Sequence, residues 1–266
     1  MKIVVFDLYN FIHRARFSFQ EGEHSITYSF YRSIKKEISN HEPDKVIFVS
    51  EGTPKSRNAL FEDYKGTRER VKDDNFSRQR KDIISSISYL PVYLYKNEDH
   101  EADDVINYIA QTANEDDQVT ILSSDTDFIQ LLKLKNVKLF NPVKKDYVKW
   151  DNNVDYVTYK SLKGDTSDNI SGVTGVGKVK AEKLASSPSD LEKFLNDCSE
   201  EERNQFILSK KLVQFMDTKD VEEKLKITKF NFEKDMLHKF FEERKFWSIL
   251  NNKVWPDWKN IFEKIS

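Results

Sequence analysis

Nine carboxylates, grouped in short clusters along the first two thirds of the chain, are the residues best suited to chemistry. Most of them directly follow a short apolar run of the kind that forms strands, so we expect them at strand ends on one rim of a sheet. A rim of like charges needs a positive partner. Hard divalent cations with oxygen ligands meet that need, and two such cations close together form a phosphoryl-transfer site. The nine are Asp7, Glu51, Glu101, Asp103, Asp104, Asp125, Asp127, Asp165 and Asp168.

Each cluster also has a plain structural interpretation. Asp7 or Asp125 could simply cap a following helix. The E-A-D-D run at 101–104 could sit at a helix start, where the helix dipole favours acids without any metal. However, three acids in four residues repel one another, and a cation would relieve that repulsion. The joint occurrence of these clusters at successive strand ends favours a metal site.

The charge distribution points to a polyanion beside that site. The net charge of −2 indicates no partner. Residues 97–132, however, hold ten Asp or Glu and no Lys or Arg, while residues 55–81 hold nine Lys or Arg against five acids. An acidic pocket next to a basic segment suits a metal site next to a nucleic acid. Phe61, Tyr64 and Phe76 lie within the basic segment and could stack a base, although a solvated charged helix would look similar.

A glycine-rich turn follows the last acid pair. Gly172, Gly175 and Gly177 permit a tight turn between two helices, and their backbone N–H groups could approach a phosphate. Lys178 and Lys180 add positive charge. The turn is not a Walker A loop, because the G-K-[ST] spacing is missing. A simple helix connection is the alternative interpretation.

Composition bounds the class of protein. The chain of 266 residues suits one large or two small domains. A single cysteine, Cys198, excludes an intrachain disulfide and indicates a reducing compartment. The apolar run after Met1-Lys2 is too short for a signal peptide, and no stretch is long enough to span a membrane. We therefore expect a cytoplasmic protein.

Alternating strand and helix patterns predict an α/β fold with a largely parallel sheet. Strands are expected at 2–6, 45–49, 91–95 and 119–123, helices at 25–40, 78–90 and 102–113, and a strand pair at 137–140 and 146–150. In such sheets, ligands gather at the carboxyl ends of the strands. After residue 152 helical periodicity dominates. We expect a core over 1–152 and a helical subdomain over 153–266, packed as one unit.

Six motifs in order resemble the flap endonuclease family of 5′-nucleases, over roughly residues 1–185. They are V-V-F-D ending at Asp7, Y-K-G-T-R at 64–68, E-A-D-D at 101–104, S-S-D-T-D-F at 123–128, G-D-T-S-D-N-I at 164–170 and G-V-T-G-V-G at 172–177. The family includes bacteriophage RNase H-type enzymes and 5′-exonucleases, and the N-terminal nuclease domain of bacterial DNA polymerase I. The resemblance implies a PIN-like fold with a helical arch over about 55–90 and a helix–turn–helix over about 165–186.

The resemblance also implies roles for the site residues. A first metal would be served by Asp7, Glu101, Asp103, Asp104 and Asp125, and a second by Asp127, Asp165 and Asp168. Lys65 and Arg68 would contact the scissile phosphate, and Arg14, Arg57, Tyr64 and the glycine turn with its lysines would contact DNA. One departure concerns the second strand. Where the family has Asp, this chain offers either Ser50 or Glu51, and we expect Glu51 to be the ligand.

The implied reaction is phosphodiester hydrolysis with two Mg²⁺ ions, for which Mn²⁺ could substitute, and K⁺ could bind at the helix–turn–helix. Expected substrates are branched or 5′-ended duplex DNA and RNA–DNA hybrid. The chain is expected to be a monomer that works beside a separate polymerase or single-strand-binding protein in replication or repair. Two alternatives are a PIN-like ribonuclease and a DNA-binding protein with a weakened site. The arch motif and the glycine turn argue against the first. The second is suggested only by the Ser50-Glu51 departure.

Overall fold

The computed structural model describes residues 1–17, 22–67 and 73–265. Its centre is a seven-stranded sheet in the order β6-β5-β4-β1-β2-β3-β9. Strands β1 to β5 run parallel, whereas β6 and β9 are antiparallel at the two edges. The strands are β1 Lys2–Asp7, β2 Lys45–Ser50, β3 Tyr93–Asn97, β4 Gln118–Leu122, β5 Val137–Asn141, β6 Asp146–Tyr147 and β9 Leu225–Lys229. The expected parallel α/β sheet and the strand pair at its edge are confirmed.

Helices cover both faces of the sheet, which explains why its strands are apolar throughout. Side chains alternate along β1, so Val4 and Phe6 pack with one helical layer while Ile3 and Val5 pack with the other. The first layer holds α1 Leu8–Arg16, α2 Ser25–His41 and α4 Asp74–Ser86. The second holds α5 Ala102–Thr112, the 3-10 helix η2 Asp127–Leu131 and α10 Thr218–Glu223.

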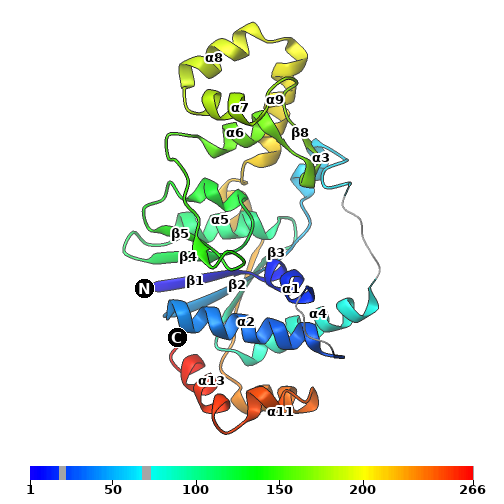
Figure 1. The fold of residues 1–266 in the computed structure, drawn as a ribbon, viewed down its shortest axis with the longest axis vertical. Coiled ribbons are helices and arrows are strands. Elements are labelled where there is room, and N and C mark those ends of the chain that lie inside the picture. The colour runs from blue at the N-terminus through cyan, green and yellow to red at the C-terminus, as the bar shows by residue number, and fades with distance from the viewer. Residues whose placement is uncertain (18–21, 68–72, 266) are drawn as a thin grey trace.

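A separate group of helices stands at one end of the elongated molecule, above the sheet in Figure 1. It has its own apolar cluster, which includes Leu162, Val176 and Phe206. The group contains α6 Tyr156–Lys163, α7 Lys178–Ala185, α8 Pro188–Asp197 and α9 Glu200–Val213. Between α6 and α7 lies a small hairpin made of β7 Gly164–Asp165, the 3-10 helix η3 Thr166–Asp168 and β8 Ile170–Ser171.

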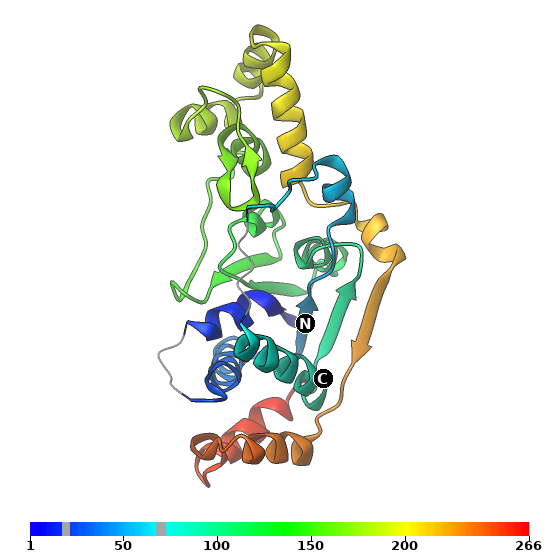
Figure 2. The same cartoon turned by 90° about the vertical axis from the view of Figure 1, so that its right-hand side faces the viewer.

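The chain after residue 224 does not belong to this upper group, which corrects the expected subdomain over 153–266. Strand β9 runs back along the outer edge of the sheet and pairs with β3 (Figure 2). The last helices then pack under the sheet against α2, at the opposite end of the molecule. They are α11 Lys234–Glu243, α12 Trp247–Leu250 and α13 Val254–Phe262.

Part of the segment expected to form a helical arch over about 55–90 belongs to the core instead. Helix α3 Lys55–Leu60 stands at the upper end of the sheet, but α4 is a core helix whose Phe76 and Ile83 are buried in the first layer. The 3-10 helix η1 Ile87–Tyr89 follows α4 where the helix was expected to continue. Within the described part of the chain, no helix combines the length and the apolarity that a membrane crossing requires.

Candidate active site

The carboxyl ends of the parallel strands bring a first group of acids together. Asp7 ends β1, Asp125 follows β4, Glu51 follows β2 and Asp103 lies in the first turn of α5. Asp7 also caps α1: its Oδ1 accepts from the Asn10 amide at 3.1 Å and its Oδ2 from the Ser123 hydroxyl at 2.9 Å. The helix-cap interpretation and the acidic-rim interpretation are therefore compatible for this residue.

The carboxylates of this first group repel one another, as the raised pKa values of three of the four indicate. Burial raises the pKa of Asp7 to about 6, despite the two hydrogen bonds that oppose the shift. Burial and then the Glu101 carboxylate raise the pKa of Glu51 to about 7. Burial and then Asp125 raise the pKa of Asp103 well above its ordinary value, with Asp7 and Glu51 adding to the effect. A nearby cation would relieve this repulsion.

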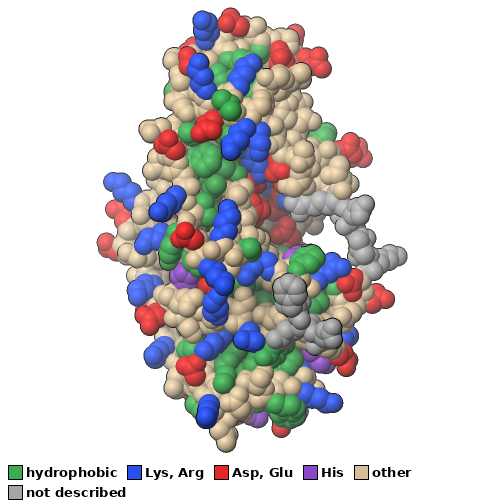
Figure 3. Space-filling model, in the orientation of Figure 1, with side chains coloured by type: hydrophobic (Ala, Val, Ile, Leu, Met, Phe, Trp, Pro, Cys, Tyr) green, Lys and Arg blue, Asp and Glu red, His purple; other side chains and the backbone are tan. Residues whose placement is uncertain are grey.

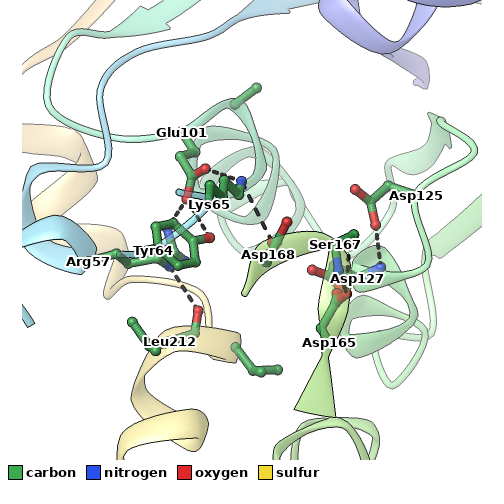
Figure 4. Close-up of polar contacts among 12 residues, drawn as sticks. Arg57, Tyr64, Lys65, Glu101, Asp125, Asp127, Asp165, Ser167, Asp168 and Leu212 are labelled. Atoms are coloured by element: carbon green, nitrogen blue, oxygen red, sulfur yellow. Dashed lines mark hydrogen bonds and ion pairs between the residues drawn. The ribbon is translucent and has the colours of Figure 1, made fainter. Parts of the chain in front are cut away.

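Three further acids form a second group on the side of the upper helices. Asp127, Asp165 and Asp168 each place one carboxylate oxygen within 4.8 Å of the others, the only such group of three in the described residues. Asp165 also caps η3 by accepting from the Ser167 amide at 2.8 Å. Figure 4 shows the three side chains converging, and Figure 3 shows Asp and Glu gathered in the hollow beneath the upper helices.

Lys160 joins this second group and was missed by the sequence analysis. Its ammonium pairs with Asp127 and lies 2.6 Å from Asp165 Oδ2, and the residue is only 7% exposed. Burial raises the pKa of Asp127 to about 6 against the pull of Lys160. For Asp165 the hydrogen bonds from Lys160 and Ser167 outweigh burial and lower the pKa to about 2. A lysine on the buried face of α6, five positions before Asp165, was the available signal.

Lys65 lies between the two groups. Its ammonium pairs with Glu101 and lies 3.8 Å from Asp168 Oδ2, while its amide donates to the Asp168 carbonyl at 3.0 Å. Although burial opposes it, Glu101 and other carboxylates raise the pKa of Lys65. The backbone of Lys65 is left-handed, with φ 56°, a conformation uncommon outside glycine. The turn at 61–67 therefore holds a cation at the centre of the acids.

Arg57 and Asp104 are corrections. Asp104 was expected to bind metal, but it is fully buried beneath the rim and both of its oxygens accept from the Arg57 guanidinium, at 2.7 and 2.8 Å. Arg57 was expected to contact DNA, yet it is 3% exposed and also donates to the Leu212 and Gln214 carbonyls. Successive helical residues point about 100° apart, so Asp103 can face the site while Asp104 faces inward.

Tyr64 is a further correction. It was expected to stack against DNA, but it is 7% exposed and its hydroxyl donates to Glu101 Oε2 at 3.1 Å. The same oxygen accepts from Arg57 at 2.8 Å. Glu101 was expected to bind metal, but both of its carboxylate oxygens are taken up by Arg57, Tyr64 and Lys65.

The second strand places Glu51, rather than Ser50, beside the acids. Ser50 is the last residue of β2 and is 7% exposed. The Glu51 carboxylate accepts from the Ala102 amide at 3.3 Å, and the charges of Glu101, Asp7 and Lys65 all act on it. Glu51 therefore lies where a ligand would be needed, and its role as a ligand stays a prediction.

Two further basic residues, Arg14 and Arg68, were also expected to contact the nucleic acid. Arg14 is half-buried on α1, stacked over the Phe11 ring, and its Nη1 is buried without a hydrogen-bond partner among the described residues. Arg68 lies outside the described residues. Arg14 is therefore held on the Phe11 ring by packing, and its expected contact with DNA stays a prediction.

The glycine turn lies between β8 and α7 and presents an exposed surface. Gly175 has φ +72°, which favours glycine, and Gly172 packs so closely on the Lys163 carbonyl that a Cβ would lie 2.4 Å from it. Gly177 begins α7 in open space, followed by the exposed Lys178 and Lys180. The turn thus offers backbone and lysines to a ligand on the outside of the upper group.

Residues 2–161 match the family model described as the 5′-3′ exonuclease, N-terminal resolvase-like domain. The chain belongs to the 5′-3′ exonuclease family. It is 30% identical over 213 residues to a 5′-3′ exonuclease of Mycoplasmopsis pulmonis, covering 73% of this chain and 69% of that one. It is 28% identical over 253 residues to DNA polymerase I of Bacillus subtilis, covering 83% of this chain but only 28% of the polymerase.

Solved structures share the fold of this exonuclease family member. The T5 5′-exonuclease, in a structure with bound divalent zinc ions, superposes with a TM-score of 0.63 at 18% identity and covers 99% of both chains. Flap endonuclease-1 from Methanococcus jannaschii gives a TM-score of 0.64 at 16% identity, covering 99% of this chain and 92% of its own. At these identities the superpositions establish the fold, and the expected 5′-nuclease architecture is confirmed.

Proposed function

We propose that this protein is a structure-specific 5′-nuclease that hydrolyses phosphodiester bonds in DNA at a 5′ end or flap, and in RNA annealed to DNA. One observation carries the proposal. Carboxylates from five separate segments of the chain converge at the carboxyl edge of a parallel sheet, with Lys65 and Lys160 among them. A purely structural rim would not concentrate so many like charges without a cation to neutralise them.

The donor set fits hard divalent cations, because it consists of carboxylate oxygens without sulfur or imidazole. We propose Mg²⁺, with Mn²⁺ as a substitute. One ion would be held by Asp7, Glu51, Asp103 and Asp125, and the other by Asp127, Asp165 and Asp168. When bound, such a pair of ions supplies an activated water and stabilises the leaving oxygen.

The chain's own residues would position the substrate. Lys65, held by Glu101 at the centre of the acids, would neutralise charge that develops on the reacting phosphate. Lys160 would keep the Asp127 and Asp165 carboxylates oriented. Lys178 and Lys180 at the glycine turn would bind phosphates of the duplex. Contacts of this kind recognise the shape of the duplex rather than its base sequence.

A cleavage assay tests the proposal. Flap duplex, nicked duplex, RNA–DNA hybrid and single strand would each be incubated with and without Mg²⁺, with Asp165→Asn as the matched variant. The expected result is Mg²⁺-dependent cleavage of the substrates with a 5′ end or flap, strongly reduced in the variant. The proposal fails if no substrate is cut, or if chelation leaves cleavage unchanged.

Four narrower expectations accompany this proposal. K⁺ binding at the glycine turn would appear as tighter duplex binding in K⁺ than in Na⁺. A monomeric state, a cytoplasmic location and a separate polymerase or single-strand-binding partner are also expected.

A further inference from the structure

A single hollow of about 830 Å³ extends beyond the second group of acids. Its lining includes Thr67, next to the Lys65 turn, and the acids Asp127 and Asp165. The same hollow is also lined by Trp150 and Tyr159. A nucleic-acid strand with one phosphate at the acids could therefore also contact the other side chains that line this hollow.

That wall is aromatic. Trp150 lies 5.5 Å from Tyr159 between ring centroids, and both contact Tyr156, at 5.2 and 6.3 Å. Tyr156 is buried, and its hydroxyl donates to Asp127 Oδ1 at 3.2 Å, so the wall is tied directly to the second group. Trp150 and Tyr159 are partly exposed and line the hollow.

Positive charge accompanies the rings. The Lys163 ammonium lies 5.7 Å from the Tyr159 ring centroid, and Lys163 is exposed at the end of α6. Lys163 lines the same hollow. Aromatic faces beside a lysine, next to a site for phosphate, form the combination that binds unpaired nucleotides through stacking and charge.

We propose that Trp150, Tyr159 and Lys163 form a subsite for one unpaired nucleotide next to the reacting phosphate, on the side away from Lys65. The base stacks on the Tyr159 ring and Lys163 pairs with a neighbouring phosphate. This proposal rests on the proposed function, because it places the nucleotide by continuity with the acids. Trp150 and Tyr159 also pack against the apolar clusters beneath them, but packing alone does not account for their exposed parts and a lysine that line the same hollow.

Fluorescence of 2-aminopurine, placed at each position around the scissile bond of a flap substrate, tests the subsite. Binding would be measured with Ca²⁺ in place of Mg²⁺. In the unmodified protein, one position next to the scissile phosphate should be quenched on binding. Tyr159→Leu should lose that quenching and bind on the order of 10-fold more weakly, the scale of one lost stacking contact. Tyr159→Phe, which keeps the ring, should retain both properties.

Two further variants exclude a merely structural effect. Tyr108→Leu removes another half-buried tyrosine that packs on the same apolar cluster, and it should leave quenching and affinity unchanged. Lys163→Gln changes an exposed side chain, so this variant tests the subsite even if Tyr159→Leu fails to fold. It should weaken DNA binding and reduce the salt dependence of that binding. Quenching and affinity that stay unchanged in Tyr159→Leu, or affinity unchanged in Lys163→Gln, would overturn the subsite.

The subsite and the proposed function can fail separately. Quenching that depends on Tyr159 without any cleavage would sustain the subsite and defeat the nuclease. Mg²⁺-dependent cleavage together with quenching and affinity that are unchanged in Tyr159→Leu would sustain the nuclease and defeat the subsite.

Discussion

Asp103 and Asp104 are neighbours in the chain with opposite surroundings. Asp103 faces Asp7, Glu51 and Asp125, whereas Asp104 is fully buried in an ion pair with Arg57. The first arrangement is unfavourable without a cation. The second already has its counter-charge and is part of the packing. Asp103 therefore needs a cation to offset the neighbouring carboxylates, whereas Asp104 contributes to the stability of the fold through Arg57.

This difference predicts separable effects of two substitutions. Asp104→Asn should lower the free energy of unfolding by about 3–5 kcal/mol, because it leaves Arg57 buried with an incomplete partner. Its affinity for Mn²⁺ should stay near that of the unmodified protein. Asp165→Asn should weaken Mn²⁺ binding, and it should also lower stability because it removes a charged partner of Lys160. Chemical denaturation and calorimetric titration measure the two quantities, and a loss of Mn²⁺ affinity in Asp104→Asn equal to that in Asp165→Asn would contradict the assignment.

The raised pKa values of Glu51, at about 7, and of Asp7 and Asp127, at about 6, predict a pH dependence of the metal-free protein. Unfolded carboxyls titrate near pH 4, so at intermediate pH the folded state holds protons that the unfolded state has released. This contribution is complete below about pH 4 and is lost as the pH rises through the folded values. The metal-free protein should therefore lose stability between about pH 4 and about pH 7, and these groups should cause no further loss above that range.

Glu51→Gln cannot ionise, so its thermal midpoint should fall less across this range than that of the unmodified protein. Ser50→Ala should follow the unmodified protein. Identical slopes for Glu51→Gln and the unmodified protein would show that Glu51 does not titrate in the group.

Residue types and spacing predicted most of the carboxylates at the site but not the partners of each one. The position of Asp7 after an apolar run was enough to place it at the sheet edge. The burial of Arg57 was not predictable in the same way, because it depends on the carbonyls of Leu212 and Gln214, far along the chain. Tyr64 likewise packs in an apolar cluster with Leu212 and Val213. Lys160 was missed because a lysine on a helix is normally solvent-exposed.

At the element scale, two segments that carry positive charge occupy different places. The 61–67 turn holds Lys65 among the acids, while the glycine turn before α7 holds Lys178 on the outer surface of the upper helices. We expect the first to act on the reacting phosphate and the second on distant duplex.

Single-turnover rates and salt-titrated affinities separate these roles. Lys65→Ala should lower the cleavage rate at saturating DNA by ~10²-fold, the scale of one lost transition-state donor, with a small effect on duplex affinity. Lys178→Ala should weaken binding and reduce the salt dependence by about one phosphate contact, with little change in the saturated rate. Saturated cleavage by Lys65→Ala at the rate of the unmodified protein would refute the role of the turn.

Elements with strong apolar periodicity were predictable. The strands β1, β2 and β4 and the helices α2 and α5 lie within a few residues of their expected positions. Strand β9 was missed because its partner β3 is distant in the chain and its side chains are mostly exposed, although Leu225, Ile227 and the intervening lysine alternate as a strand would. The charge-rich sequence after residue 152 resembled continuous helix.

On the scale of the whole molecule, the chain leaves the sheet for the upper helices and then returns. The return adds an edge strand and three helices, and buries Leu237, Phe241, Trp258 and Phe262 against the first layer. The segment from Leu225 onward is therefore structural support for the core of the molecule.

Removing residues 225–266 should accordingly abolish cooperative folding rather than yield a smaller nuclease, because it exposes one whole side of the apolar core. Circular dichroism during heating would show a broad, weak transition in the shortened chain. A sharp transition near that of the full chain would mean that the C-terminal helices are an accessory.

The central claim is that two groups of carboxylates together hold the cations for phosphodiester cleavage. Single-turnover cleavage of a 5′-flap duplex, measured as a function of Mg²⁺ concentration, tests it most directly. We predict no cleavage in chelator and a rate that rises with more than the first power of Mg²⁺ before it saturates, since both groups must fill. Asp165→Asn should shift this curve to higher Mg²⁺. Cleavage that persists in chelator, or a first-power dependence that Asp165→Asn leaves unchanged, would contradict the account.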